Sequence, residues 1–296
     1  MKRYRQSLAE NIFDVFNVLI MLLLSFAMIY PFINQLALSF NEGVDATRGG
    51  IYFYPRKFTL ENYEYLMRES NLGRSALISI LRITVATTLC LLCTGLLSYV
   101  VTVRNFSGRR FMRLIFLITM YFGGGLIPFY LLIVKLRLLE TFTVYWLPAL
   151  VSPYYMLIIS SYMQNLPESL SESARLDGAS ELTIFLKVIF PVSIPVFASV
   201  AIFCAVSHWN SWFDVLLYNP SGKWDTLQVI LRKLLLEVEM VRNLQFEQLA
   251  SEKYRSLTPA TVRAATTMIV TIPIIVVYPF LQKYFVSGIT LGAVKG

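Results

Sequence analysis

The chain alternates between long apolar runs and shorter polar segments. Six of the runs are long enough to cross the roughly 30 Å hydrocarbon core of a bilayer as a helix. We predict these spans at about 12–39, 75–101, 112–134, 142–164, 184–208 and 264–286. The first run is too long for a signal peptide and no small-residue cleavage site follows it, so we expect it to stay as an anchor. The pattern predicts an all-α polytopic membrane protein with a single transmembrane domain over 12–290.

The composition agrees with this prediction. Of 296 residues, 56% are hydrophobic and 15% are charged, and the mean hydropathy is +0.60. A soluble domain of this length would need more polar surface. The cysteines Cys90, Cys93 and Cys204 all fall inside apolar spans, where zinc or thiol chemistry lacks the polar setting that it needs. We therefore expect them to be packing residues, and we predict no metal site.

The charges of the connections bear on orientation. An even number of spans places both termini on one side, and the basic residues of the 1–11 segment and of the 102–111 connection favour the cytoplasm for that side. When every connection is counted, however, the opposite side carries more basic residues, many of them in the 209–263 segment. The charge rule alone therefore leaves the orientation open.

Two polar connections are long enough to hold structure of their own. In the 40–74 segment, Thr59 is a good N-cap and Glu61 suits the first turn of a short surface helix that caps the bundle. In the 209–263 segment, apolar residues at helical spacing from Leu227 to Val241 predict an amphipathic helix on the membrane or on the bundle. Whether that helix is only structural or also contacts a ligand stays open.

Ionisable groups inside the spans limit the kinds of transport that the chain could carry out. No Asp or Glu lies inside spans two to six, whereas proton- and sodium-coupled carriers use such carboxylates near the midplane. Arg82 is the cation well inside an apolar span. In one interpretation its guanidinium extends to the membrane interface or pairs with a backbone carbonyl. In the other it faces a water-filled path and binds an anionic substrate.

Aromatic and polar side chains gather at the outer end of the fifth span. Such groups are interfacial anchors in many membrane proteins, but flat rings with amide and carboxylate groups also suit a sugar. The candidates for the substrate path are, besides Arg82, Tyr154, Tyr155, Trp209, Asn210, Trp212 and Asp214. In the third span, the run Gly123-Gly124-Gly125 predicts a broken helix, which a membrane tolerates where the backbone lines a cavity.

A charged, helix-forming segment at 167–178 interrupts the apolar pattern between spans four and five. Pro167 suits the first helical position, Glu168 and Glu172 suit the first turns, and Gly178 suits the stop. We expect a helix of about ten residues, followed by a span bent at Pro191 and Pro195. Its apolar stripe and charged rim fit docking into a groove on another protein, and a solvated linker helix is the alternative.

The spacing in this segment resembles that of a known family. Glu172-Ser173-Ala174, three residues, Gly178, nine residues and Val188-Ile189-Phe190-Pro191 is similar to the EAA motif of permease subunits of binding-protein-dependent ABC importers. Ser173, Val188 and Phe190 depart conservatively from that motif. The segments Tyr54–Tyr63, Gly123–Pro128 and Trp209–Phe213 resemble the carbohydrate-uptake branch. There the chain is similar to the maltose-type second permease and to permeases of oligosaccharide importers, including alginate-type importers.

The resemblance implies a type I importer permease fold and a mechanism of alternating access. Two homologous permeases, expected to form a heterodimer, would enclose the path in the bacterial inner membrane, and an extracytoplasmic binding protein would deliver the oligosaccharide. Two cytoplasmic ATPases would use ATP and magnesium, because this chain has no phosphate-binding loop and is expected to bind no cofactor. No role for nucleic acid is implied. The residues implied to couple this chain to the ATPases are Glu168, Glu172, Ser173, Ala174, Arg175, Asp177, Gly178 and Pro191.

Under this resemblance 167–178 is the cytoplasmic coupling helix, both termini are cytoplasmic, and 209–263 is extracytoplasmic. The chain is then a transport subunit and not an enzyme. Arg82 and the outward basic residues add the hypothesis that the sugar is acidic, such as a uronate oligosaccharide. The alternatives are a peptide or amino acid as substrate or, more distantly, a carrier that works without ATP.

Overall fold

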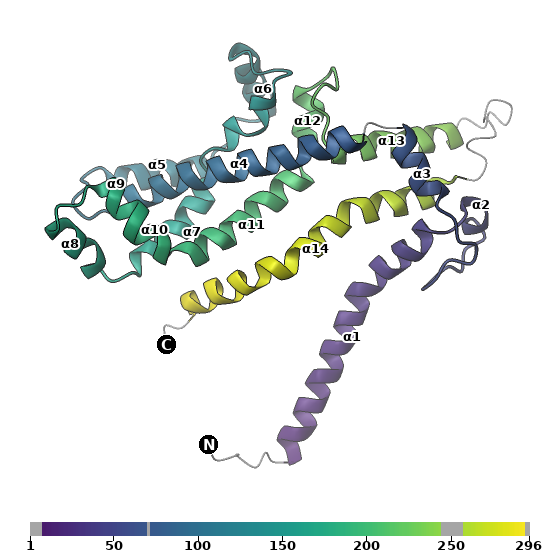
Figure 1. Cartoon of the computed structure of the whole chain (residues 1–296), viewed down its shortest axis with the longest axis horizontal. Coiled ribbons are helices and arrows are strands. Elements are labelled where there is room, and N and C mark those ends of the chain that lie inside the picture. The colour runs from purple at the N-terminus through teal and green to yellow at the C-terminus, as the bar shows by residue number, and fades with distance from the viewer. Residues whose placement is uncertain (1–7, 70–71, 244–256, 294–296) are drawn as a thin grey trace. The chain divides into compact units, whose positions relative to one another are not determined.

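The computed structural model describes residues 8–69, 72–243 and 257–293, and these residues are almost entirely helical (Figure 1). The helices are α1 (Leu8–Ser39), α2 (Gly43–Ala46), α3 (Glu61–Glu69), α4 (Leu72–Val100), α5 (Arg109–Tyr121), α6 (Leu126–Lys135), η1 (Phe142–Tyr145), η2 (Leu147–Ala149), α7 (Pro153–Gln164), α8 (Ser169–Leu176), α9 (Glu181–Ile184), η3 (Phe185–Ile189), α10 (Phe190–Val192), α11 (Ile194–Asn210), α12 (Phe213–Tyr218), α13 (Leu227–Asn243) and α14 (Pro259–Ala293). The all-α prediction is confirmed, and among the described residues an isolated bridge between Asn41 and Phe58 is the extent of β pairing.

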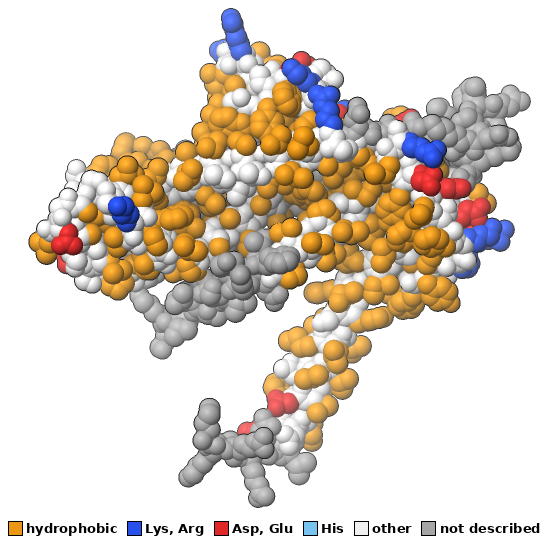
Figure 2. Space-filling view, in the orientation of Figure 1, with side chains coloured by type: hydrophobic (Ala, Val, Ile, Leu, Met, Phe, Trp, Pro, Cys, Tyr) orange, Lys and Arg blue, Asp and Glu red, His pale blue; other side chains and the backbone are white. Residues whose placement is uncertain are grey.

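The described part of the chain contains several apolar helices of membrane-spanning length. In the described part, three helices are long and apolar enough to cross a bilayer, and the number rises to six if each of three bent pairs counts as one span. In Figure 2 hydrophobic side chains cover the sides of the long helices, whereas the charged side chains on this face lie near helix ends. Apolar helices thus lie within each of the predicted ranges, and both the span boundaries and the count of six stay predictions.

The bends fall where the sequence interrupts the helical backbone. Helices α5 and α6 meet at 115° across Gly123–Gly125, where Gly125 has a φ of +83° that suits a residue without Cβ. Pieces of the fifth predicted span meet at 82°, after the π-helical turn Phe185–Ile189 and next to Pro191 and Pro195. The fourth predicted span is also bent, by 46°. It begins as 3₁₀ turns, and Ser152 then caps a new helix. The sequence analysis did not predict this bend.

The chain divides into two compact units, which we describe separately. In the larger unit, residues 71–230 and 273–296, α4 packs against α7 and α11, and α5 packs against α7 (Figure 1). Ile159, Phe185, Phe197 and Val200 form the centre of its main apolar cluster. Gly95 allows the close approach of α4 to Phe197.

The smaller unit comprises residues 1–70 and 231–272. Its predicted surface helix is α3. The Glu61 amide donates to Thr59 Oγ1 at 3.2 Å, but the helix begins at Glu61 and the Leu60 carbonyl accepts its first helical bond, so Thr59 lies one residue before the N-cap position. The buried Asn62 side chain donates to the carbonyls of Ser39 and Asn41 at 2.9 and 3.0 Å. These bonds fasten α3 to the end of α1. The predicted amphipathic helix is α13, and Val241 lies outside the residues whose side chains are described.

Candidate functional site

Helix α8 forms in the polar break, as the sequence predicts, but it is shorter than expected. It spans eight residues, Ser169–Leu176, and Glu168 stands at the N-cap position without a side-chain capping bond. The helix ends because Gly178 adopts a φ of +80°, a left-handed conformation that favours glycine. The Gly178 and Ala179 amides then donate to the carbonyls of Arg175 and Ala174, each at 3.0 Å. Gly178 therefore closes the helix as a C-terminal cap.

The helix has one anchored face and one open face. Ala174 is half-buried and packs against the main apolar cluster of the larger unit. Glu172, Ser173 and Asp177 are exposed, and the apolar side chain of Leu176 is 89% exposed. Carboxylates and an uncovered leucine on one short helix are typical of a surface that a protein partner covers.

A carboxylate outside the helix fixes its orientation. The Arg175 Nε donates to Glu181 Oε1 at 2.8 Å and its Nη2 donates to Glu181 Oε2 at 3.3 Å, which raises the pKa of Arg175 above its usual value. The Tyr99 hydroxyl, at the end of α4, donates to the same carboxylate. Glu181 thus joins α8 to α4. The sequence analysis missed Glu181 and Tyr99. Glu181 lies 6 residues from Arg175 and 82 residues from Tyr99, and the helical spacing of the polar segment indicates neither contact.

Two further predicted coupling residues lie at the edges of this arrangement. The Glu168 carboxylate pairs with Arg104 Nη1 at 2.5 Å, which joins the start of α8 to the connection after α4. Pro191 is exposed at the start of α10, directly after the π-helical turn. It marks the bend of the span rather than the surface of α8.

Arg82 lies in the larger unit and its partner is a carboxylate, not a backbone carbonyl. Its side chain is 2% exposed and forms an ion pair with Asp214, and its guanidinium lies 4.8 Å from the centroid of the Tyr145 ring. The Ser211 hydroxyl donates to Asp214 Oδ1 at 2.6 Å. Burial and pairing keep this charge inside the protein, so direct contact with a substrate would require the ion pair to open.

Two of the remaining path candidates, Trp212 and Tyr155, pack against different apolar clusters. Trp212 packs against the cluster of Ile133, Val144, Tyr145, Val215, Tyr218 and Val229, whereas Tyr155 packs against the main cluster. Trp209 is half-buried and Asn210 is exposed at the end of α11. Tyr154 is 52% exposed. The structure therefore brings Arg82 and Asp214 together but keeps Tyr155 in a different cluster from Trp212.

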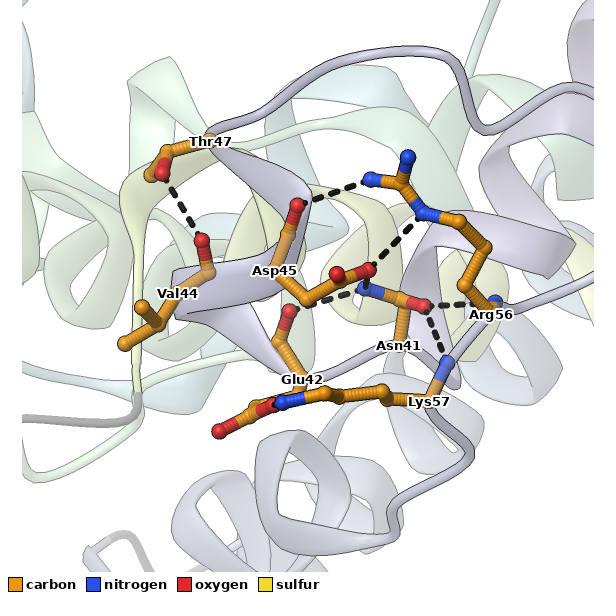
Figure 3. Close-up of polar contacts among 7 residues, drawn as sticks. All are labelled: Asn41, Glu42, Val44, Asp45, Thr47, Arg56 and Lys57. Atoms are coloured by element: carbon orange, nitrogen blue, oxygen red, sulfur yellow. Dashed lines mark hydrogen bonds and ion pairs between the residues drawn. The ribbon is translucent and has the colours of Figure 1, made fainter.

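A hydrogen-bonded loop in the smaller unit was not foreseen (Figure 3). The Asp45 carboxylate accepts from Asn41 Nδ2 at 3.1 Å and from Arg56 Nε at 3.0 Å. Asn41 Oδ1 in turn accepts from the amides of Arg56 and Lys57 at 2.8 and 3.0 Å. The Asn41 hydrogen bond, assisted by Arg56, holds the pKa of Asp45 below its usual value. The loop is thus a fixed platform at the end of α1.

The predicted packing cysteines are free thiols, with Cys90 and Cys204 buried and Cys93 half-buried. Over the described ranges, no three His, Cys, Asp or Glu side chains come together in a way that could hold a metal ion.

Comparisons with known proteins identify the family of the chain. Residues 1–291 match the family described as binding-protein-dependent transport system inner membrane component. The protein LplC of Bacillus subtilis is 35% identical over 97% of this chain and 96% of its own length. A polygalacturonan/rhamnogalacturonan transport system permease of the same organism, YtcP, is 31% identical over 97% of this chain and 99% of its own.

A solved structure supports the same fold. It is described as the crystal structure of a bacterial ABC transporter involved in the import of the acidic polysaccharide alginate. It matches with a TM-score of 0.83 and 26% identity, over 96% of this chain and 100% of the other. Together with the family match over residues 1–291, these likenesses show that the chain belongs to the binding-protein-dependent transport system inner membrane components, the permease subunits of ABC importers.

Proposed function

We propose that α8 is the coupling helix through which cytoplasmic ATPases drive this permease. The observation that carries the proposal is the open face of α8, where Glu172 and Asp177 are exposed and Leu176 is 89% exposed. The other face is fixed by Ala174 and by the Arg175–Glu181–Tyr99 contacts. A helix that is rigidly attached on one side and uncovered on the other transmits the movement of a partner to the spans that hold it.

In this mechanism the energy source lies outside the chain. Two ATPases bind and hydrolyse ATP with magnesium, and their closure displaces α8 of this subunit and of a second, homologous permease. Because Tyr99 ends α4 and contacts Glu181, displacement of α8 pulls on α4 and on the turn that leads into α11. The cavity between the permeases then opens alternately to each side. Because the ATPases are cytoplasmic, this proposal also assigns α8 to the cytoplasm, and with an even number of spans it assigns both termini there.

Charge reversal on the open face tests this mechanism. In proteoliposomes with the partner permease, the ATPases and the binding protein, we expect Glu172→Lys and Gly178→Pro to assemble in the membrane but to hydrolyse ATP without uptake. Glu64→Lys is the matched control, because Glu64 is an exposed carboxylate on α3 that pairs with Arg68 one helical turn away. Uptake coupled to hydrolysis as in the wild type, in both α8 variants, would reject the proposal.

We infer further that the transported solute is an oligosaccharide, with an acidic one favoured. The support comes from relatives along nearly the full length of the chain, one named for polygalacturonan and rhamnogalacturonan and one for the acidic polysaccharide alginate. Rings and polar groups at Trp209, Asn210 and Trp212 provide surfaces of the kind that sugars use. Arg82 gives no independent support, because Asp214 already balances its charge.

Competition for uptake identifies the solute class. Oligouronides and neutral oligosaccharides of equal length are offered against a labelled oligogalacturonide, with a dipeptide as the non-sugar control. We expect the oligouronides to compete best and the dipeptide not to compete. Preference for the neutral sugars would reject the acidic assignment, and competition by the dipeptide would reject a sugar altogether.

A further inference from the structure

A basic cavity lies between α8 and the start of α5, within the larger unit. Its volume is about 530 Å³, and its walls come from the end of α4, the connection to α5, the first turns of α5, the end of α7 and the start of α8. Five arginines line it: Arg104, Arg109, Arg110, Arg113 and Arg175. The wall also includes the carboxylate of Glu168. The cavity is therefore strongly positive.

Three of these arginines have no carboxylate partner among the residues that the structure describes. Glu168 balances Arg104, and Glu181, which is not part of the wall, balances Arg175. In the described part of the chain, Arg109, Arg110 and Arg113 form no ion pair. Arg113 Nη2 donates to the Val101 carbonyl at 3.1 Å, but its buried Nε has no hydrogen-bond acceptor. A buried charged donor without an acceptor is costly, so an anion is the group that would complete this site.

The cavity is also apolar on the side of α5. Leu114 and Leu117 belong to its wall, and Leu114, Phe111 and Ile118 on α5 are 54%, 68% and 47% exposed. The arginines occupy the first turns of α5, and the exposed apolar residues continue along the same helix toward Tyr121. An anion site that continues into an apolar helix surface matches a phosphate group that carries an acyl chain.

We propose that this cavity binds the headgroup phosphate of an anionic phospholipid, with Arg109, Arg110 and Arg113 as its ligands and the acyl chains along α5. The placement at the cytoplasmic interface rests on the proposed role of α8. Free phosphate is also an anion, but it has no apolar group to cover Phe111, Leu114 and Ile118. A soluble protein partner would leave these residues uncovered in the bilayer. A bound lipid would contact the wall that Glu168, Ser171 and Arg175 of α8 provide, and would so adjoin the coupling helix.

The test uses the complete transporter in nanodiscs of phosphatidylcholine with and without phosphatidylglycerol. A photoactivatable phosphatidylglycerol should label the peptide that contains residues 101–117, and the matching phosphatidylcholine probe should not. Combined substitution Arg109→Gln, Arg110→Gln and Arg113→Gln should lower this labelling at least about tenfold. The matched control, Lys135→Gln, Arg137→Gln and Lys223→Gln, changes three basic residues elsewhere in the same unit and should label as the wild type does.

Several outcomes would overturn the proposal. They are equal labelling by both lipid probes, unchanged labelling of the three-arginine variant, and displacement of the probe by inorganic phosphate. Because Arg110 is exposed, Arg110→Gln alone should lower labelling without altering assembly. This single variant keeps the proposal testable even if the combined variant fails to fold. Labelling is read without ATP. It therefore succeeds or fails independently of whether Glu172→Lys uncouples hydrolysis from uptake.

Discussion

At the scale of single residues, the most consequential feature is a buried charge that another part of the chain balances. Arg82 in α4 meets Asp214 in α12, 132 residues later. Such a pair gains little stability over apolar residues, because both charges lose water, but the loss of one partner leaves the other charge unbalanced inside the protein. The pair therefore specifies how α4 meets α12 more than it stabilises the fold.

Removal of Asp214 tests this interpretation. We expect Asp214→Ala to lower the free energy of unfolding by about 3 kcal/mol, the lower end of the range for a broken buried pair because Asp214 is partly exposed. The double variant Arg82→Met with Asp214→Ala should recover most of the loss. Thermal unfolding of the purified protein in detergent measures both, with the exposed Asp177→Ala as control. If Asp214→Ala were as stable as the wild type, this would contradict the assignment of Asp214 as the partner that balances the buried charge of Arg82.

The Asp45 carboxylate makes the 41–58 loop sensitive to acid. Its folded-state pKa lies below the usual 3.8, so ionised Asp45 stabilises the loop above that value, and the contribution disappears as the pH falls through the lowered pKa. Hydrogen exchange of the 41–58 amides, corrected for intrinsic rates, should show protection that falls in acid. Asp45→Asn should reduce protection already at neutral pH and remove the acid step. A step that persists in this variant, with the exposed Glu61→Gln as control, would contradict the role of Asp45.

At the scale of elements, α4 and α11 approach closely where Gly95 of α4 has no Cβ atom and leaves room for Phe197 of α11. A Cβ on Gly95 would lie 2.5 Å from Phe197 Cε1 and 2.7 Å from its Cζ. We expect Gly95→Ala to destabilise the protein by about 1–3 kcal/mol through overpacking, and Phe197→Leu to restore part of the loss in the double variant. Gly73→Ala, where a Cβ would meet nothing within 4 Å, is the matched control. Equal stability of both alanine variants in thermal unfolding would contradict the packing argument.

The helices themselves could be predicted, because an apolar run of sufficient length has few other structures in a membrane. The breaks at Gly123–Gly125 and near Pro191 were also predictable, since glycine and proline interrupt helices by known means. The partners of Arg82 and Arg175 were not. The partner of Arg82 lies 132 residues away and depends on which helices pack together, and the partner of Arg175, six residues away, depends on how the chain turns after α8. Asn41, Asp45 and Arg56 were missed for the same reason, although Asn and Asp four residues apart in a loop are typical of side-chain networks.

At the scale of the whole molecule, a permease of an ABC importer needs one group that receives force and a packed body that transmits it. Helix α8 has the open face, and Tyr99, Glu168 and Glu181 tie it to neighbouring elements. The packed body is α4 with α7 and α11, which meet along buried residues. We therefore expect that, in the assembled transporter, the ATPase covers Leu176.

Site-specific photocrosslinking tests this central claim most directly. A photoreactive phenylalanine analogue replaces Leu176 on the open face of α8 or, as control, Tyr54, which is 75% exposed in the other unit. After illumination of the assembled transporter, we predict that the Leu176 position forms a covalent product with the ATPase subunit and that the Tyr54 position does not. A product with the ATPase from Tyr54, or none from Leu176, would contradict the assignment of α8 as the coupling helix.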